Sequence, residues 1–185
     1  MYVGHAALAI LAKAKRPRVP IALLVPLAFA PDWIEWLGGL LGRHERTFSH
    51  SLVSVGIGAS LAALLYWLAT RAAADAIVVW LTYASHWPAD FVTGLKPTWP
   101  GGPTVGLALY NHPVWDAVLE CALVVLAWVA YRRSLRPEVQ RRAIAVLVPL
   151  GLVAMQIAFE AIQRPTVEIS AARLPATLDP HPSTL

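Results

Sequence analysis

An uncharged run of eighteen residues, Leu52 to Ala69, limits most strongly what this chain can fold into. A bilayer core about 30 Å thick needs roughly 20 helical residues, and a second uncharged run, Ala143 to Phe159, is seventeen residues long. The chain is 57% hydrophobic and only 14% charged, whereas a soluble domain is about a quarter charged. Disordered chains carry few apolar residues and many charges. The sequence therefore predicts a membrane protein.

Four other apolar segments are shorter. Ala76 to Ala89 and Cys121 to Tyr131 reach spanning length only if their polar ends lie near the membrane surface. Met1 to Ala12 and Val19 to Ala30 are too short to span alone. We therefore expect an all-α, polytopic membrane helical bundle with about four spanning helices and a shorter N-terminal helical hairpin.

The end of the chain differs from the rest in composition. Four prolines follow Arg164, and no sustained apolar period accompanies them. We therefore expect residues 1–164 to form a single membrane-embedded helical domain and residues 165–185 to form a disordered C-terminal tail.

The basic residues are unevenly distributed. If the chain reverses direction at each break, ten of the fifteen lysines and arginines fall on one side. These ten are Lys13, Lys15, Arg16, Arg18, Arg71, Arg132, Arg133, Arg136, Arg141 and Arg142. Cytoplasmic loops carry the Lys/Arg excess, so loops 31–50 and 91–112 are expected on the extracytoplasmic side of a bacterial-type inner (plasma) membrane. The lipid bilayer is the expected partner, and nucleic acid is not, because the basic residues are not interleaved for nucleic-acid binding.

Histidines and acidic residues gather on the predicted outer side. Two pairs, His86 with Asp90 and His112 with Asp116, have i, i+4 spacing, and on a helix such residues project from one face. Imidazole with carboxylate is a common ligand set for Zn²⁺. A carboxylate near the bilayer centre costs about 2.5–3.5 kcal/mol on insertion scales, which a bound metal would offset. We therefore predict a divalent metal site, with zinc as the expected ion.

Other residues could complete such a site. Asp32 and Glu35 directly follow an apolar run, although each could instead cap a helix start, where the helix dipole favours carboxylates. His50 precedes the eighteen-residue run and His5 begins the first apolar segment, where a lone histidine is more often an interfacial residue. The predicted metal ligands are His5, Asp32, His50, His86, Asp90, His112 and Asp116.

Three sequence blocks resemble a known family. After an early His5, the blocks L-A-F-A-P-D at 27–32, R-T-F-S-H-S at 46–51 and S-H-W-P-A-D-F-V-T at 85–93 are similar to the LexA-binding, inner-membrane-associated hydrolase family. The resemblance covers roughly residues 1–116 and implies a membrane-bound, metal-dependent protein. A more distant similarity, to the zinc-dependent phospholipase C and P1 nuclease group, implies an all-α scaffold that gathers His and Asp around zinc. By the order of the motifs along the chain, the seven predicted ligands would correspond to the His and Asp residues that this group gathers around zinc.

These observations lead to a hypothesis and a rival. The hypothesis is a metal-dependent hydrolase that acts at the outer interface on a phosphoester or other ester of an amphiphilic substrate, such as a lipid or lipid-linked phosphate. Asp32 or Glu35, if not a metal ligand, would take a proton from water, and the residues predicted to neutralise a substrate phosphate are Arg43, Arg46 and Lys96. The rival is a non-catalytic membrane protein, either a metal or proton conduit or a binding scaffold. Because most acids lie on one predicted side, the sequence favours a one-sided site over a conduit.

Overall fold

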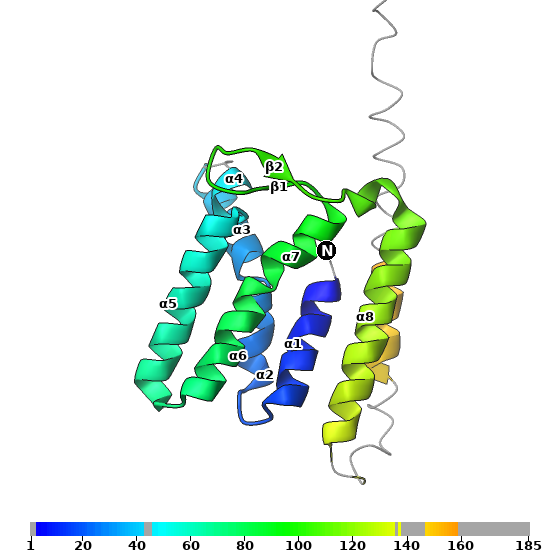
Figure 1. Cartoon of the computed structure of the whole chain (residues 1–185). Helices are drawn as coiled ribbons and strands as arrows, with labels where there is room; N and C mark the ends of the chain where they lie inside the picture. Colours follow the sequence, from blue (N-terminus) through cyan, green and yellow to red (C-terminus); the bar gives the residue numbers. More distant parts are fainter. Residues whose placement is uncertain (1–2, 43–45, 136, 138–146, 159–185) are drawn as a thin grey trace, which may run out of the picture.

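The computed structural model describes residues 3–42, 46–135, 137 and 147–158, and these are mostly helical (Figure 1). The labelled helices are α1 (Val3–Lys15), α2 (Ile21–Ala28), α3 (Ala30–Leu40), α4 (Arg46–Ser49), α5 (Leu52–Thr70), α6 (Ala73–Ala84), α7 (His86–Thr93), the 3-10 turn η1 (Leu109–Asn111) and α8 (Pro113–Ser134). A two-stranded antiparallel hairpin, β1 (Lys96–Pro97) with β2 (Thr104–Val105), follows α7. A further apolar helix covers Leu147–Ala158. The all-α expectation is confirmed.

Two helices, α5 and α8, are long and apolar enough to cross a membrane. The side chain of Ser51 accepts a hydrogen bond from the N–H of Ser54 and so caps the start of α5, and Arg71 ends this helix in a left-handed conformation. Helix α8 begins with Pro113. Its missing N–H costs no hydrogen bond, because the N–H at this position has no partner inside a helix. Most large side chains on α5 are exposed leucine, isoleucine or valine. These properties are consistent with a membrane protein.

The expected number of about four spanning helices is not confirmed. Within the described residues there are two candidate spans, or up to three if α2 and α3, which meet at a bend of 61°, form one broken span. The run Ala76 to Ala89 does not form one helix, because α6 ends at Ala84 and α7 begins at His86. Most of Ala143 to Phe159 lies in the Leu147–Ala158 helix, which is shorter than a span, and the predicted tail 165–185 lies outside the described residues.

Helix α1 occupies the middle of the bundle and contacts α2, α6 and α8. With α2 it forms the expected short N-terminal hairpin. One core cluster joins α1 to α8 through Val3, Ala7, Ile10, Val124 and Ala127, and part of the Leu147–Ala158 helix packs against it. A second cluster joins the other side of α1 to α2 and α6. Each side of α1 therefore packs against a different part of the bundle.

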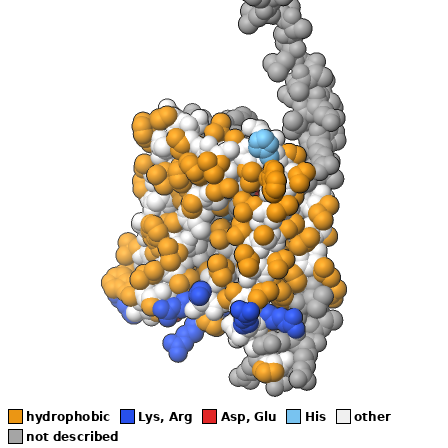
Figure 2. Space-filling view, turned by 45° about the vertical axis from the view of Figure 1, so that its right-hand side comes forward, with side chains coloured by type: hydrophobic (Ala, Val, Ile, Leu, Met, Phe, Trp, Pro, Cys, Tyr) orange, Lys and Arg blue, Asp and Glu red, His pale blue; other side chains and the backbone are white. Residues whose placement is uncertain are grey.

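Lysine and arginine side chains gather at one end of the molecule, while hydrophobic side chains cover the flank above them (Figure 2). Three chain segments meet at this end: the α1–α2 loop, the α5–α6 turn and the C-terminal end of α8 (Figure 1). We call it the basic end; its described basic residues are Lys13, Lys15, Arg16, Arg18, Arg71, Arg132 and Arg133. The predicted grouping of these residues on one side is therefore present in the fold.

The hairpin and α7 lie at the opposite end, which we call the site end (Figure 1). Two hydrogen bonds attach the hairpin to the bundle: Trp87 Nε1 donates to the carbonyl of Pro97 at 3.3 Å, and Val53 N donates to the carbonyl of Thr98 at 3.2 Å. These contacts fix the position of Lys96, the first residue of β1, over the end of α7.

Candidate metal centre

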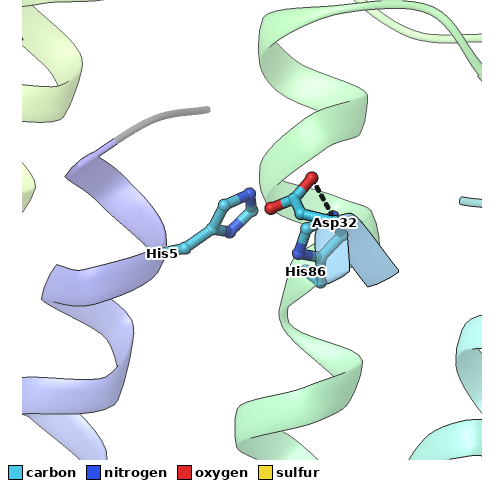
Figure 3. Close-up of side chains that lie close together, drawn as sticks. All are labelled: His5, Asp32 and His86. Carbon is cyan, nitrogen blue, oxygen red and sulfur yellow. Dashed lines mark ion pairs between the residues drawn. The ribbon is translucent and has the colours of Figure 1, made fainter. Parts of the chain in front are cut away.

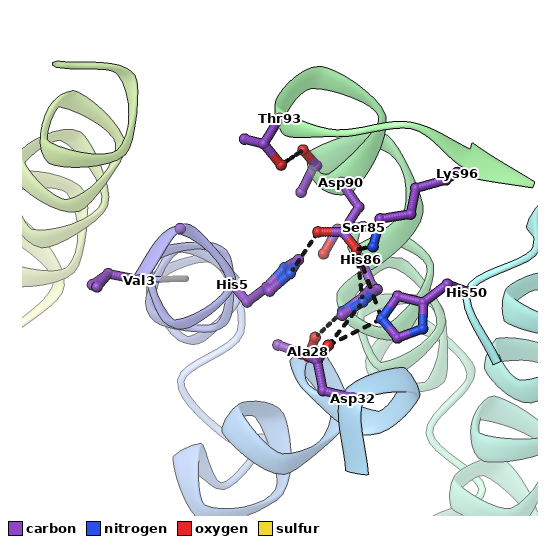
Figure 4. A network of polar contacts seen from close by, with 12 residues as sticks. Val3, His5, Ala28, Asp32, His50, Ser85, His86, Asp90, Thr93 and Lys96 are labelled. Carbon is purple, nitrogen blue, oxygen red and sulfur yellow. Dashed lines mark hydrogen bonds and ion pairs between the residues drawn. The ribbon is translucent and has the colours of Figure 1, made fainter. Parts of the chain in front are cut away.

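Three histidines and two aspartates converge at the site end from four separate segments (Figures 3 and 4). His5 comes from α1, Asp32 from α3, His50 from the junction of α4 and α5, and His86 with Asp90 from α7. Two groups have ligand atoms that all lie within 4.8 Å of one another: His5, Asp32 and His86, and His50, His86 and Asp90. Because His86 belongs to both groups, the two form one cluster. Such groups could hold a metal ion.

His86 has the geometry of a metal-binding histidine. It is fully buried, and its Nδ1 donates to the carbonyl oxygen of Ala28 at 2.8 Å. This bond fixes the tautomer, so that Nε2 carries a lone pair. Nε2 has no hydrogen-bond partner among the described residues, and it lies 3.4 Å from Asp90 Oδ2 and 3.8 Å from Asp32 Oδ1. An orphaned, buried ring nitrogen that faces two carboxylates fits a divalent cation.

His5 stacks on His86 with a ring-centroid distance of 4.0 Å and an interplanar angle of 10°. Its Nε2 lies 3.2 Å from Asp90 Oδ1, and its buried Nδ1 makes no hydrogen bond within the described residues. Burial lowers the pKa of His5 to about 4 because the charged ring loses its hydration. The ring is therefore neutral at physiological pH, which is the form that binds metals.

His50 is held from both sides of its ring. Nε2 lies 3.0 Å from Asp32 Oδ1, whereas Nδ1 lies 2.9 Å from Ser49 Oγ and 3.2 Å from Glu35 Oε2. A carboxylate on the far nitrogen of a histidine orients the ring and increases its basicity toward a metal. Glu35, predicted as a catalytic group, therefore lies behind His50 and outside both ligand groups.

Asp90 contacts several ionisable side chains. Besides His5 and His86, it binds Lys96, whose Nζ lies 2.7 Å from Asp90 Oδ2. Burial alone would raise the pKa of the Asp90 carboxyl, but its contacts with His5 and His86 hold this pKa well below its usual range. Lys96, predicted to bind substrate phosphate, is thus an ion-pair partner of a candidate ligand.

The cluster opens to its surroundings at α3. The side chain of Asp32 is 45% exposed and that of Glu35 is 32% exposed, whereas the side chain of Asp90 is only 4% exposed. Asp32 is therefore the most exposed of the cluster's candidate ligands.

The two predicted ligands on α8 are not brought into the cluster. His112 is exposed and precedes the first helical residue, with a non-helical backbone conformation (φ −127°, ψ 70°). It therefore does not project from the same helical face as Asp116, although the spacing is i, i+4. Asp116 is buried on α8 but belongs to neither ligand group. Arg43 lies outside the described residues, and Arg46 begins α4.

Two contacts near the cluster could not be predicted from the sequence. The carbonyl of Ala28 orients His86, and a backbone carbonyl carries no side-chain motif. Glu120 accepts hydrogen bonds from the N–H groups of Val3 and Gly4, at the start of α1. The sequence indicates only that Glu120 is an acid inside an apolar segment, and its partners lie more than 100 residues away.

Comparison with known proteins gives no match: no family model, curated protein or solved structure matches this chain. The resemblance to the LexA-binding, inner-membrane-associated hydrolase family therefore stays a prediction carried by three short sequence blocks.

Proposed function

We propose that this chain is a membrane-embedded, metal-dependent hydrolase whose metal centre consists of His5, Asp32, His50, His86 and Asp90. The observation that carries the proposal is the convergence of these side chains from four segments, with Nε2 of His86 buried among carboxylates and without a hydrogen bond to any described residue. Burying such a set in a bundle without an ion is costly, and a divalent cation would offset that cost. Membership of the resembled family is part of the same proposal.

Zinc is the proposed ion, because imidazole nitrogens with carboxylate oxygens are its common ligands. When bound in a hydrolytic site, zinc lowers the pKa of water to about 7 and polarises a phosphoryl or carbonyl oxygen. Of the two carboxylates in the cluster, Asp32 is the exposed one, and if it does not ligate the ion it would take the proton of the attacking water. Glu35 keeps His50 oriented through its Nδ1.

The surroundings of Asp32 favour an amphiphilic substrate. The same helix, α3, exposes large hydrophobic side chains, with Trp33 at 56% and Trp36 at 61% exposure. Tryptophan is enriched at membrane–water interfaces, so an ester at this depth would have its apolar part in the bilayer. Lys96, which forms an ion pair with Asp90, would be the group that neutralises a substrate phosphate. A lipid or lipid-linked phosphate is the proposed substrate class.

The site end is proposed to face the extracytoplasmic side, because the basic end carries the lysine and arginine excess of cytoplasmic loops. The test uses single cysteines in a Cys121→Ser background. Thr104→Cys, in the hairpin, should react with an impermeant thiol reagent added to intact cells, whereas Pro17→Cys, at the basic end, should react only after the cells are opened. The reverse pattern would invert the orientation.

The function itself is tested by metal analysis of the detergent-purified protein together with hydrolysis of phosphate and carboxylic esters of lipids. We expect bound zinc, turnover that chelation stops, and recovery on adding zinc. His86→Ala should lose both metal and turnover. A wild-type protein that binds no divalent metal would reject the hydrolase and leave the binding scaffold.

The conduit is disfavoured by the distribution of charge in the described helices. Helix α5, Leu52–Thr70, contains no Asp, Glu, His, Lys or Arg, the residue types that mark ion and proton paths inside membranes. At the basic end, Asp75 is paired with Arg16 near the surface, at 3.9 Å. The buried ionisable side chains of the described chain belong instead to the site end and the adjacent start of α1 and α8.

A further inference from the structure

The start of α1 is held by a side chain from α8. A single oxygen of Glu120, Oε2, accepts hydrogen bonds from the N–H groups of Val3 at 2.7 Å and Gly4 at 2.8 Å, and Glu120 is 0% exposed. The first N–H groups of a helix have no partner inside the helix, and a carboxylate there also interacts favourably with the helix dipole. The first turn of α1 contains no acidic residue of its own. Glu120 therefore supplies the carboxylate that this turn lacks.

His5 lies in the same turn. It is the third residue of α1 and directly follows Gly4, and glycine costs about 1 kcal/mol of helix stability relative to alanine. A first turn with a glycine and no acidic side chain of its own is prone to fraying. Fraying would move the ring of His5 away from Asp90 and His86, which it contacts at 3.2 Å and through ring stacking.

The two sides of this turn face different neighbours. Val3 points toward α8, while His5 points away from α8 toward α7 and α3 (Figure 4). Val3 packs in the apolar cluster with Val124 and Ala127 of α8. Apolar contacts are non-directional, so they do not fix the axial position of a helix as two hydrogen bonds to one oxygen do. The hydrogen bonds from the start of α1 to Glu120 of α8 thus help to position His5 in the cluster.

We infer that Glu120 is a positioning residue of the metal centre, which acts through the first turn of α1 to place His5. The inference rests on the proposed function, because it takes the cluster as a metal site. Glu120 itself does not touch the ion. Its role requires an acceptor oxygen at the start of α1, and it depends on His5 being present.

The experiment measures zinc affinity of the full-length, detergent-purified chain by competition with a chelator. Glu120→Met keeps the volume of the side chain but removes the acceptor, and we expect affinity to fall about tenfold, as when a residue that orients a metal ligand is lost. Glu120→Gln keeps an acceptor oxygen and should retain most of the affinity. Val118→Ala, on the exposed side of α8, is the matched control and should leave affinity unchanged.

A double-mutant cycle separates positioning from general loss of structure. In a His5→Ala background, adding Glu120→Met should lower zinc affinity less than twofold, because the residue that Glu120 places is gone. An equal loss in both backgrounds, or no loss in either, would overturn the inference. If Glu120→Met does not give folded protein, Glu120→Asp takes its place, since its shorter carboxylate cannot reach both N–H groups. The absence of zinc from the wild-type chain would reject the proposed function instead.

Discussion

Both ends of the helical bundle carry ionisable side chains, but the buried histidines and carboxylates among the described residues lie at the site end. At the site end, Lys96 Nζ lies 2.7 Å from Asp90, whose side chain is almost fully buried. At the basic end, Arg16 lies 3.9 Å from Asp75, and the Arg16 side chain is 48% exposed. The two pairs have the same charges but different surroundings.

The number of charges at one end of the bundle does not by itself identify a site. Exposed charges are solvated and contribute little as pairs, whereas each buried charge needs a partner. At the site end, burial forces histidines, aspartates and a lysine into mutual contact. At the basic end, the Arg16–Asp75 pair is long at 3.9 Å, and its arginine is half exposed. Only the site end therefore requires a chemical explanation.

The largest expected effect is the loss of metal from the site end. His86→Ala and Asp90→Ala should each lower zinc affinity by more than the roughly 10–100-fold that loss of a residue orienting a ligand costs. Arg16→Ala, at the basic end, should leave zinc content unchanged. Metal analysis of the purified variants tests this. Full zinc occupancy in the His86→Ala variant would remove the distinction between the two ends.

Acid should destabilise the metal-free protein through the site end. The pKa of His5 is lowered by burial to about 4, so between about pH 6.5 and 4 the unfolded chain binds a proton that the folded chain does not. Stability therefore falls as the pH is lowered through this window, by roughly 3 kcal/mol for this one residue.

The measurement is thermal unfolding in chelator and detergent at several pH values. His5→Gln should show a shallower loss of stability between pH 6.5 and 4 than the wild-type chain does. Parallel curves for the two proteins would show that His5 is protonated without cost in the folded state.

Removing the cation of the buried pair should destabilise the metal-free protein. Lys96→Met leaves Asp90 with one partner fewer inside the bundle, and we expect a loss of about 2 kcal/mol in unfolding free energy. Zinc carries the opposite charge to Asp90 and should restore stability in the variant. Unfolding with and without zinc tests this, and a variant that stays less stable when loaded with zinc would show that the ion does not compensate for the lost charge beside Asp90.

A smaller effect is expected at the edge of the site. Glu35→Gln should lower zinc affinity about tenfold, because His50 loses the carboxylate on its Nδ1 while Ser49 still contacts that atom. Asp75→Asn, which neutralises an acid at the basic end, is the control and should not change zinc affinity. Zinc affinity that stays at the wild-type value in Glu35→Gln would show that Ser49 suffices to orient His50.

The bounds of some helices can be predicted from the sequence more completely than those of others. The eighteen-residue run predicts α5 almost to its ends, because an uncharged run with polar flanks has few alternatives. Ala76 to Ala89 is also uncharged, yet the helix is interrupted at Ser85, and the new helix has Pro88 in its first turn. Proline is tolerated in a first turn, where its missing N–H has no helical partner. Hydropathy does not reveal such an interruption.

Five of the seven predicted ligands meet in the candidate cluster, but which segments meet could not be predicted. His86 with Asp90 and His112 with Asp116 have identical spacing, and only the first pair joins the cluster. Spacing indicates which side chains share a face if both are helical, whereas His112 precedes its helix. Which helices meet is a long-range property, as the contact between Glu120 and the start of α1 also shows.

The smallest effect is expected at the basic end. Arg16→Met and Asp75→Asn should each change the unfolding free energy by less than about 1 kcal/mol, because this pair is long at 3.9 Å and exposed on the arginine side. High salt should reduce even this effect, since screening acts on exposed charges, while the Lys96→Met loss at the site end should be insensitive to salt. Thermal unfolding of the three variants at low and high salt tests both statements. A salt-independent loss of several kcal/mol in Asp75→Asn would mean that the basic end also contains a structured charge site.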